Sequence, residues 1–229
     1  MTPTDVIVAT LTAMLLGVTL AGLVARDRVR LCRSFAGLLA ATLLCNQLIT
    51  HLPQRFWNST FWTFKEGLYA GLYCATVLEL ALLVFAGLPR AKRPLLAAMT
   101  TVILAVAVLV ATTDLERTNL VRTVISGFNA AAAWLAAMLV IAVIFYRLPL
   151  HPFHRLVLFG IGFHLSLYSM LLGPIADGWS AMRAYVNALD RVVYFVTLSL
   201  WLWAAWRREP AQALTGEAAA VLQPWAARA

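Results

Sequence analysis

Seven long apolar segments, separated by short polar connections, constrain the fold of this 229-residue chain more than any other feature. A helix needs about 20 mostly apolar residues to cross the hydrocarbon core of a bilayer. The chain is 62% hydrophobic, whereas soluble domains are roughly 45 to 50% apolar. The sequence therefore predicts an all-α polytopic membrane protein, a bundle of seven transmembrane helices at 6–25, 34–52, 67–88, 95–112, 123–146, 156–175 and 187–206.

These spans form one predicted domain, residues 1–208, because no connection is long enough to hold a separate folded unit. Residues 209–229 form an Ala-rich tail, either a short interfacial helix or an unstructured segment. Small residues at Gly67, Gly71 and the run that begins at Asn129 would let helices approach closely. That close packing would serve either the bundle itself or a homo-oligomer.

Basic residues are concentrated on one side of the predicted bundle. Lys and Arg in short loops remain on the cytoplasmic side, so the N-terminus is predicted outside and the C-terminus in the cytoplasm. No basic residue precedes the first span, which favours a retained signal anchor. The +8 net charge is split by side and does not indicate nucleic-acid binding, but the basic loops could dock an anionic lipid or a protein partner. The residues on this side are Arg26, Arg28, Arg30, Arg33, Arg90, Lys92, Arg93, Arg147, Arg155, Arg207, Arg208 and Arg228.

Polar residues inside the spans indicate which helix faces point inward, because such side chains are costly next to lipid. Glu79 and His164 each lie about nine residues from the cytoplasmic end of a predicted span, so we expect them at one depth and in contact. This contact would be either a structural hydrogen bond or a proton or substrate site. The full predicted intramembrane cluster is Glu79, His164, Asn129, Tyr168, Asn46 and Thr76.

A second group of polar residues lies near the predicted outer boundary. Six of them could line an externally open pocket, or could be solvated by lipid headgroups: Gln47, His51, Glu66, Asn187, Asp190 and Arg191. The aromatic-rich stretch from Pro53 to Glu66 reads as a loop in the membrane interface, which places Lys65 in a loop.

Several chemistries are disfavoured by the residues present. A retinal protein needs a lysine in its final span, and both lysines, Lys65 and Lys92, are predicted in loops. His151 and His154 fall in a cytoplasmic loop, and His51 and His164 lie at unmatched depths, which argues against zinc and haem sites. No phosphate loop or nucleophile motif is found. We therefore expect no cofactor, no metal site and no catalytic residue, with an intramembrane enzyme as a distant third interpretation.

Four stretches resemble a group of short seven-helix bacterial inner-membrane proteins: FWTFKEGLYAGLYCATVLEL from Phe61, GLPRAKRP from Gly87, ERTNLVRTV from Glu116 and GIGFHLSLY from Gly160. The resemblance implies a multi-pass protein of the bacterial inner membrane and supplies no activity. Pro53 and Gln54 give a weaker similarity to sugar transporters of the PQ-loop type, although the second copy of that dipeptide is missing.

Two hypotheses for function follow. The first is a non-enzymatic sensor, receptor-like protein or accessory subunit whose polar interior is structural or binds a small or lipidic ligand. The alternative is a small, proton-coupled transporter that uses Glu79 and His164.

Overall fold

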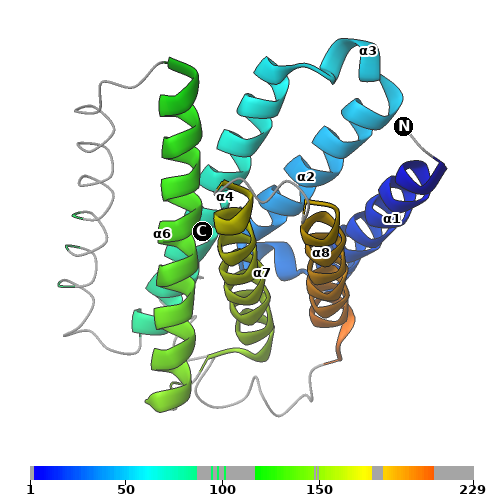
Figure 1. Ribbon diagram of the computed structural model, residues 1–229. Helices are drawn as coiled ribbons and strands as arrows, with labels where there is room; N and C mark the ends of the chain where they lie inside the picture. Colours follow the sequence, from blue (N-terminus) through cyan, green and yellow to red (C-terminus); the bar gives the residue numbers. More distant parts are fainter. Residues whose placement is uncertain are drawn as a thin grey trace.

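The computed structural model describes residues 3–86, 117–176 without 147 and 149, and 183–208, together with the single residues 94, 97 and 101. Every regular element in this part of the chain is helical (Figure 1). Apart from residues 97 and 101, the predicted span at 95–112 and the predicted tail lie outside the described residues. The elements are α1 (Pro3–Ala25), the 3₁₀ turn η1 (Arg28–Arg30), α2 (Arg33–His51), α3 (Pro53–Phe56), α4 (Ser59–Ala86), α6 (Arg117–Phe145), α7 (Pro152–Ala176) and α8 (Arg183–Trp206).

The six long helices within the described residues pack as a closed ring. Going around it, α1 contacts α2, α2 contacts α4, α4 contacts α6, α6 contacts α7, α7 contacts α8, and α8 returns to α1. A further contact joins α4 to α7 across the ring. In Figure 1, α2 ends and α4, α6 and α8 begin at the upper end of the bundle, whereas α1 and α8 end and α2 begins at the lower end.

Four of the described helices are long and apolar enough to cross a membrane: α1 over Val6–Ala25, α4 over Ser59–Phe85, α6 over Gly127–Phe145 and α8 over Tyr185–Trp206. Their outward faces carry large apolar side chains. On α6, Trp134, Met138, Ile141 and Phe145 are exposed at the spacing of one helix face. Apolar faces of this kind suit a lipid environment and would be unusual on a soluble monomer. A membrane protein is therefore supported.

Three aromatic rings meet in the lower part of the core. The buried ring of Phe35 on α2 meets the rings of Trp201 on α8 and Phe153 on α7 edge to face, at centroid distances of 5.1 and 6.1 Å. Gly160 on α7 makes room for the indole of Trp201, because a Cβ atom at Gly160 would overlap the indole nitrogen. The early helix α2 is thus held against the late helices α7 and α8 at one place.

The helix α4 begins eight residues before the predicted span at 67–88, so the prediction of a loop at 59–66 is wrong. The side-chain oxygen of Asn58 accepts a hydrogen bond from the Phe61 amide at 2.7 Å, which is the geometry of a helix N-cap. The aromatic residues after Asn58 therefore continue into a helix, and Pro53–Phe56 form the short helix α3. Lys65, predicted in a loop, is a buried residue of α4.

Side chains from other elements tie the lower end of the bundle together. The buried guanidinium of Arg28 donates to the carbonyl oxygens of Ala204 and, at 2.7 Å, Arg207, where α8 ends. His154 on α7 lies 3.0 Å from the carbonyl oxygen of Leu31 through its Nε2 atom. Since helix ends leave carbonyl groups unsatisfied, a cation at the end of α8 also complements the helix dipole.

Candidate functional site

A polar pocket of about 220 Å³ lies among five helices in the upper half of the bundle. The lining residues come from the middle and upper parts of these helices, which brings together residues far apart in the sequence. The lining residues are Thr42 and Asn46 from α2, Lys65, Glu66, Tyr69 and Tyr73 from α4, Asn129 from α6, His164, Leu165 and Tyr168 from α7, and Asp190 and Tyr194 from α8.

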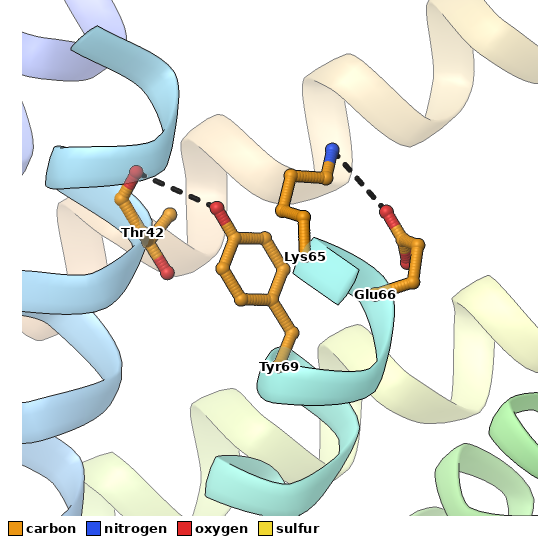
Figure 2. Close-up of polar contacts among 4 residues, drawn as sticks. All are labelled: Thr42, Lys65, Glu66 and Tyr69. Carbon is orange, nitrogen blue, oxygen red and sulfur yellow. Dashed lines mark hydrogen bonds and ion pairs between the residues drawn. The ribbon is translucent and has the colours of Figure 1, made fainter. Parts of the chain in front are cut away.

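The α4 wall of the pocket carries an ion pair. The Lys65 ammonium lies 3.2 Å from a carboxylate oxygen of Glu66 and 3.5 Å from the ring centroid of Trp62. The Tyr69 hydroxyl donates to the carbonyl oxygen of Thr42 at 3.5 Å and so joins α4 to α2. Figure 2 shows Lys65 reaching to Glu66 while Tyr69 reaches across to α2. The buried lysine charge is therefore compensated within the chain, as a buried charge requires.

Three tyrosine rings surround the imidazole of His164. The ring centroids of Tyr73, Tyr168 and Tyr194 lie 6.1, 6.1 and 5.5 Å from that of His164. His164 is only 8% exposed, and its Nδ1 atom has no hydrogen-bond partner among the described residues. An imidazole nitrogen in this position accepts or donates according to its tautomer.

Two more buried atoms of the pocket also have no partner among the described residues. They are the side-chain oxygen Oδ1 of Asn129, a residue that is 7% exposed, and Oδ1 of Asp190. Nearly all buried polar groups in proteins are hydrogen-bonded, and each exception needs an explanation. Three exceptions from three helices at one pocket indicate a place for water or for a ligand with polar groups.

The pocket combines residues from both groups predicted from the sequence. Four members of the intramembrane cluster, Asn46, Asn129, His164 and Tyr168, line it with two members of the outer group, Glu66 and Asp190. The remaining predicted residues, Thr76, Gln47, His51, Asn187, Arg191 and Glu79, do not line it.

Most of these other residues occupy separate places. The Thr76 hydroxyl donates to the Leu72 carbonyl of its own helix. Gln47 and His51 line a second pocket of about 330 Å³ between α1 and α2, which Asn46 also reaches. Asn187 and Arg191 are exposed.

Glu79 lies in the lower half of the bundle, and the structure does not bring it together with His164. Its two carboxylate oxygens accept from the backbone amides of Arg33 and Ser34 at 3.0 and 2.9 Å, and the Ser34 hydroxyl donates to it as well. Glu79 therefore caps the start of α2. The expected shared depth failed because α7 begins at Pro152, four residues before its predicted span, which places His164 twelve residues above the lower end of α7, whereas Glu79 lies seven residues before Ala86 at the lower end of α4.

The Cys32 thiol also contacts this carboxylate. Its sulfur lies 3.5 Å from Oε2 of Glu79. Burial, reinforced by the charge of Glu79, raises the pKa of the Cys32 thiol to about 12. The thiol stays protonated at neutral pH and donates to the carboxylate, which is a structural role.

Six lining residues are not among the site residues predicted from the sequence: Thr42, Lys65, Tyr69, Tyr73, Leu165 and Tyr194. Lys65 was missed because α4 was begun too late. Tyr194 follows Asp190 by four residues, so the helical repeat could have placed both on one face. In the part of the chain that the structure describes, no group of three His, Cys, Asp or Glu residues is arranged to hold a metal ion.

Comparisons of this chain with protein-family models, curated proteins and solved structures give no match.

Proposed function

We propose that this protein is a non-enzymatic membrane protein of the sensor, receptor-like or accessory-subunit class, which binds a small polar ligand in the pocket between α2, α4, α6, α7 and α8. The observation that carries the proposal is the convergence on one pocket of three buried polar atoms, from Asn129, His164 and Asp190, that have no hydrogen-bond partner among the described residues. The ligand is bound and released unchanged.

Energetics favours binding over a purely structural role. A buried polar group without a partner costs about 1–3 kcal/mol, so a bundle selected only for stability would carry apolar side chains at these positions. Polar residues inside membrane proteins commonly mark ligand, ion or substrate sites. The cost at Asn129, His164 and Asp190 is recovered when a ligand supplies the missing hydrogen bonds.

The proposed topology has seven spans in a bacterial inner membrane, with the N-terminus outside and the upper end of the bundle facing outward. The pocket would then face the external side, and the arginines around η1 would face the cytoplasm. An anionic lipid or a protein partner at these basic loops would connect ligand binding to the cell interior. A homo-oligomer belongs to the same proposal.

Transport is the second candidate, and the buried imidazole of His164 favours it. A histidine whose Nδ1 atom has no partner in the described part of the chain, in a pocket that also contains Glu66 and Asp190, could carry a proton together with a substrate. Glu79 has no part in this version, because its oxygens are engaged at the start of α2. Substrate uptake into proteoliposomes that depends on a proton gradient, and is lost in His164→Gln, would favour transport over sensing.

The decisive experiment for ligand binding is thermal unfolding of the purified protein in detergent against a library of small polar compounds. A compound that binds the pocket raises the unfolding temperature of the wild type. Asn129→Leu removes an unpartnered polar group from the pocket and should abolish that rise. Asn187→Leu makes the same substitution at an exposed position of α8 outside the pocket and should retain it. If both variants respond like the wild type, the pocket is not the binding site.

A further inference from the structure

We infer that the ligand of this pocket is a small organic cation with N–H donors, that is, a protonated amine. The inference rests on the proposed function and adds the chemical class of the ligand. It is carried by the charges that line the pocket, by its unpartnered atoms and by its aromatic walls.

The charges of the pocket leave one carboxylate without a compensating cation from the lining residues. Glu66 and Asp190 are acidic, and Lys65 is the basic residue of the lining. Lys65 already lies against Glu66 at 3.2 Å and over the Trp62 ring. The Lys65 charge therefore compensates Glu66 on the same helix, α4, whereas the Asp190 carboxylate lies on α8.

The three pocket atoms without a partner among the described residues would be satisfied by hydrogen-bond donors of a ligand. Oδ1 of Asp190 and Oδ1 of Asn129 are acceptors, and Nδ1 of His164 is an acceptor when the ring proton is on Nε2. An ammonium group carries only donors, up to three of them. A carboxylate or phosphate ligand would instead place further acceptors opposite these oxygens.

The walls and the size of the pocket fit the same class. The tyrosine rings of Tyr73, Tyr168 and Tyr194 surround His164, and aromatic faces attract cations. A volume of about 220 Å³ is below the roughly 300 Å³ at which drug-sized pockets begin. The ligand is therefore a compact molecule.

Two series of matched probes test the charge preference. One consists of butylammonium, butan-1-ol and butyrate, and the other of benzylammonium, benzyl alcohol and benzoate. Isothermal titration of the purified protein in detergent should show binding of the ammonium member of at least one series, at least tenfold tighter than its alcohol or carboxylate. Tetramethylammonium, a cation without N–H donors, should bind more weakly than butylammonium.

Variants locate the effect at the pocket. Asp190→Asn keeps the shape of the side chain and should weaken ammonium binding about tenfold or more. Asp27→Asn makes the same change at an exposed position in the turn after α1 and should leave binding unchanged. Glu66→Gln is a second test, which still applies if Asp190→Asn does not fold. It leaves the Lys65 charge uncompensated and should therefore also weaken binding of the amine.

The outcomes separate the inference from the proposed function. Preference for the carboxylate or the alcohol overturns the cation inference and leaves a ligand-binding pocket in place. Equal binding to Asp190→Asn, Glu66→Gln and the wild type overturns the assignment to this pocket. No binding by any probe, together with no hit in the wider compound library, overturns both.

Discussion

The backbone amide of Ser34 at the start of α2 donates to Oε2 of Glu79 on α4, at 2.9 Å. An acid in the middle of an apolar stretch thus supplies the N-terminal cap of a different helix. The first amides of a helix have no partner within it, and a negative charge there also complements the helix dipole. Glu79 stabilises the lower end of the bundle and is remote from the pocket chemistry.

Replacing Glu79 should destabilise the protein without changing ligand binding. Glu79→Gln loses the charge and replaces one acceptor oxygen with an NH₂ group, which faces the N–H and O–H donors of Arg33 and Ser34. Glu79→Ala loses both acceptor oxygens. Loss of a helix cap costs about 0.5–2 kcal/mol, and we expect Ala to be at least as destabilising as Gln. Thermal unfolding in detergent measures the effect. Asp27→Asn, at an exposed carboxylate, is the matched control with no expected change. A Glu79→Gln protein of normal stability that has lost its ligand response would contradict the capping role.

The same substitution should have different effects on stability at His164 and at His154. His164→Phe removes the Nδ1 atom that has no partner among the described residues and keeps a ring among the tyrosines, so stability should be unchanged or higher by about 1 kcal/mol. His154→Phe removes the partner of the Leu31 carbonyl and should lower stability by about 1–3 kcal/mol. Both histidines are buried, at 8% and 6% exposure, which makes the pair well matched.

The ligand response gives the second half of that comparison. His164→Phe should lose the stabilisation that a ligand confers, and His154→Phe should keep it. Destabilisation by His164→Phe comparable to that of His154→Phe would mean that the imidazole has a structural partner, and would count against the proposed site.

Gly160→Ala should be strongly destabilising. The added methyl group would overlap the indole of Trp201, which is almost fully buried and cannot move away freely. Overpacking of this kind costs about 1–3 kcal/mol. Gly17→Ala, where no atom lies within 4 Å of the new Cβ, should be neutral or slightly stabilising, because Ala is the better helix former. Combining Gly160→Ala with Trp201→Phe should recover part of the loss in a double-mutant cycle, and the absence of recovery would contradict the assigned contact.

Arg28→Gln should loosen the junction of η1 with the end of α8. The variant loses the positive charge and the paired donation to the Ala204 and Arg207 carbonyls, at a buried position. We expect a fall in stability of about 1.5–3 kcal/mol, the usual worth of hydrogen bonds to charged groups. Arg28→Lys keeps the charge but not the planar fork, so it should recover only part of the loss. Arg30→Gln, at an exposed arginine of the same turn, is the control; an equal effect at both positions would rule out a specific clamp.

Cysteine labelling tests the proposed orientation. Asn58→Cys and Arg30→Cys place exposed thiols at the upper and lower ends of the bundle. A membrane-impermeant maleimide added to intact cells should label the first variant and label the second only after lysis. The wild type is the control, since Cys32 and Cys45 are buried and Cys74 is half-buried. The reverse labelling pattern would contradict an external N-terminus.

Helix positions were largely predictable because apolar length decides them. α1, α2, α6, α7 and α8 each begin and end within about six residues of a predicted span. The start of α4 was not, because Asn58 acts as a cap in a stretch whose aromatic residues also suit an interface loop. The Asn58 cap favours a helix there, whereas the aromatic composition favours an interfacial loop, and the prediction rested on the composition.

The pocket was only partly predictable for a different reason. The cost of polar groups in lipid singled out Asn129 and His164, and a position near the outer boundary singled out Asp190, but neither signal says which helices are neighbours. The pairing of Glu79 with His164 assumed equal depths counted from the cytoplasmic ends of the two spans, but α7 begins four residues before its predicted span and so carries His164 further from the lower end than Glu79. Contacts between helices come from packing, which a single sequence does not encode position by position.

The clamp at Arg28 also has a consequence for biosynthesis. Its carbonyl acceptors lie 176 and 179 residues further along the chain, and α1 has α8 as one of its two principal helix neighbours in the ring. When the first helix enters the membrane, the last helix has not yet been translated. The face of α1 that packs on α8, and the Arg28 guanidinium, therefore have no α8 partner until the chain is almost completely synthesised. Truncation before α8 would therefore leave the first helix, and not only the last, without its partner.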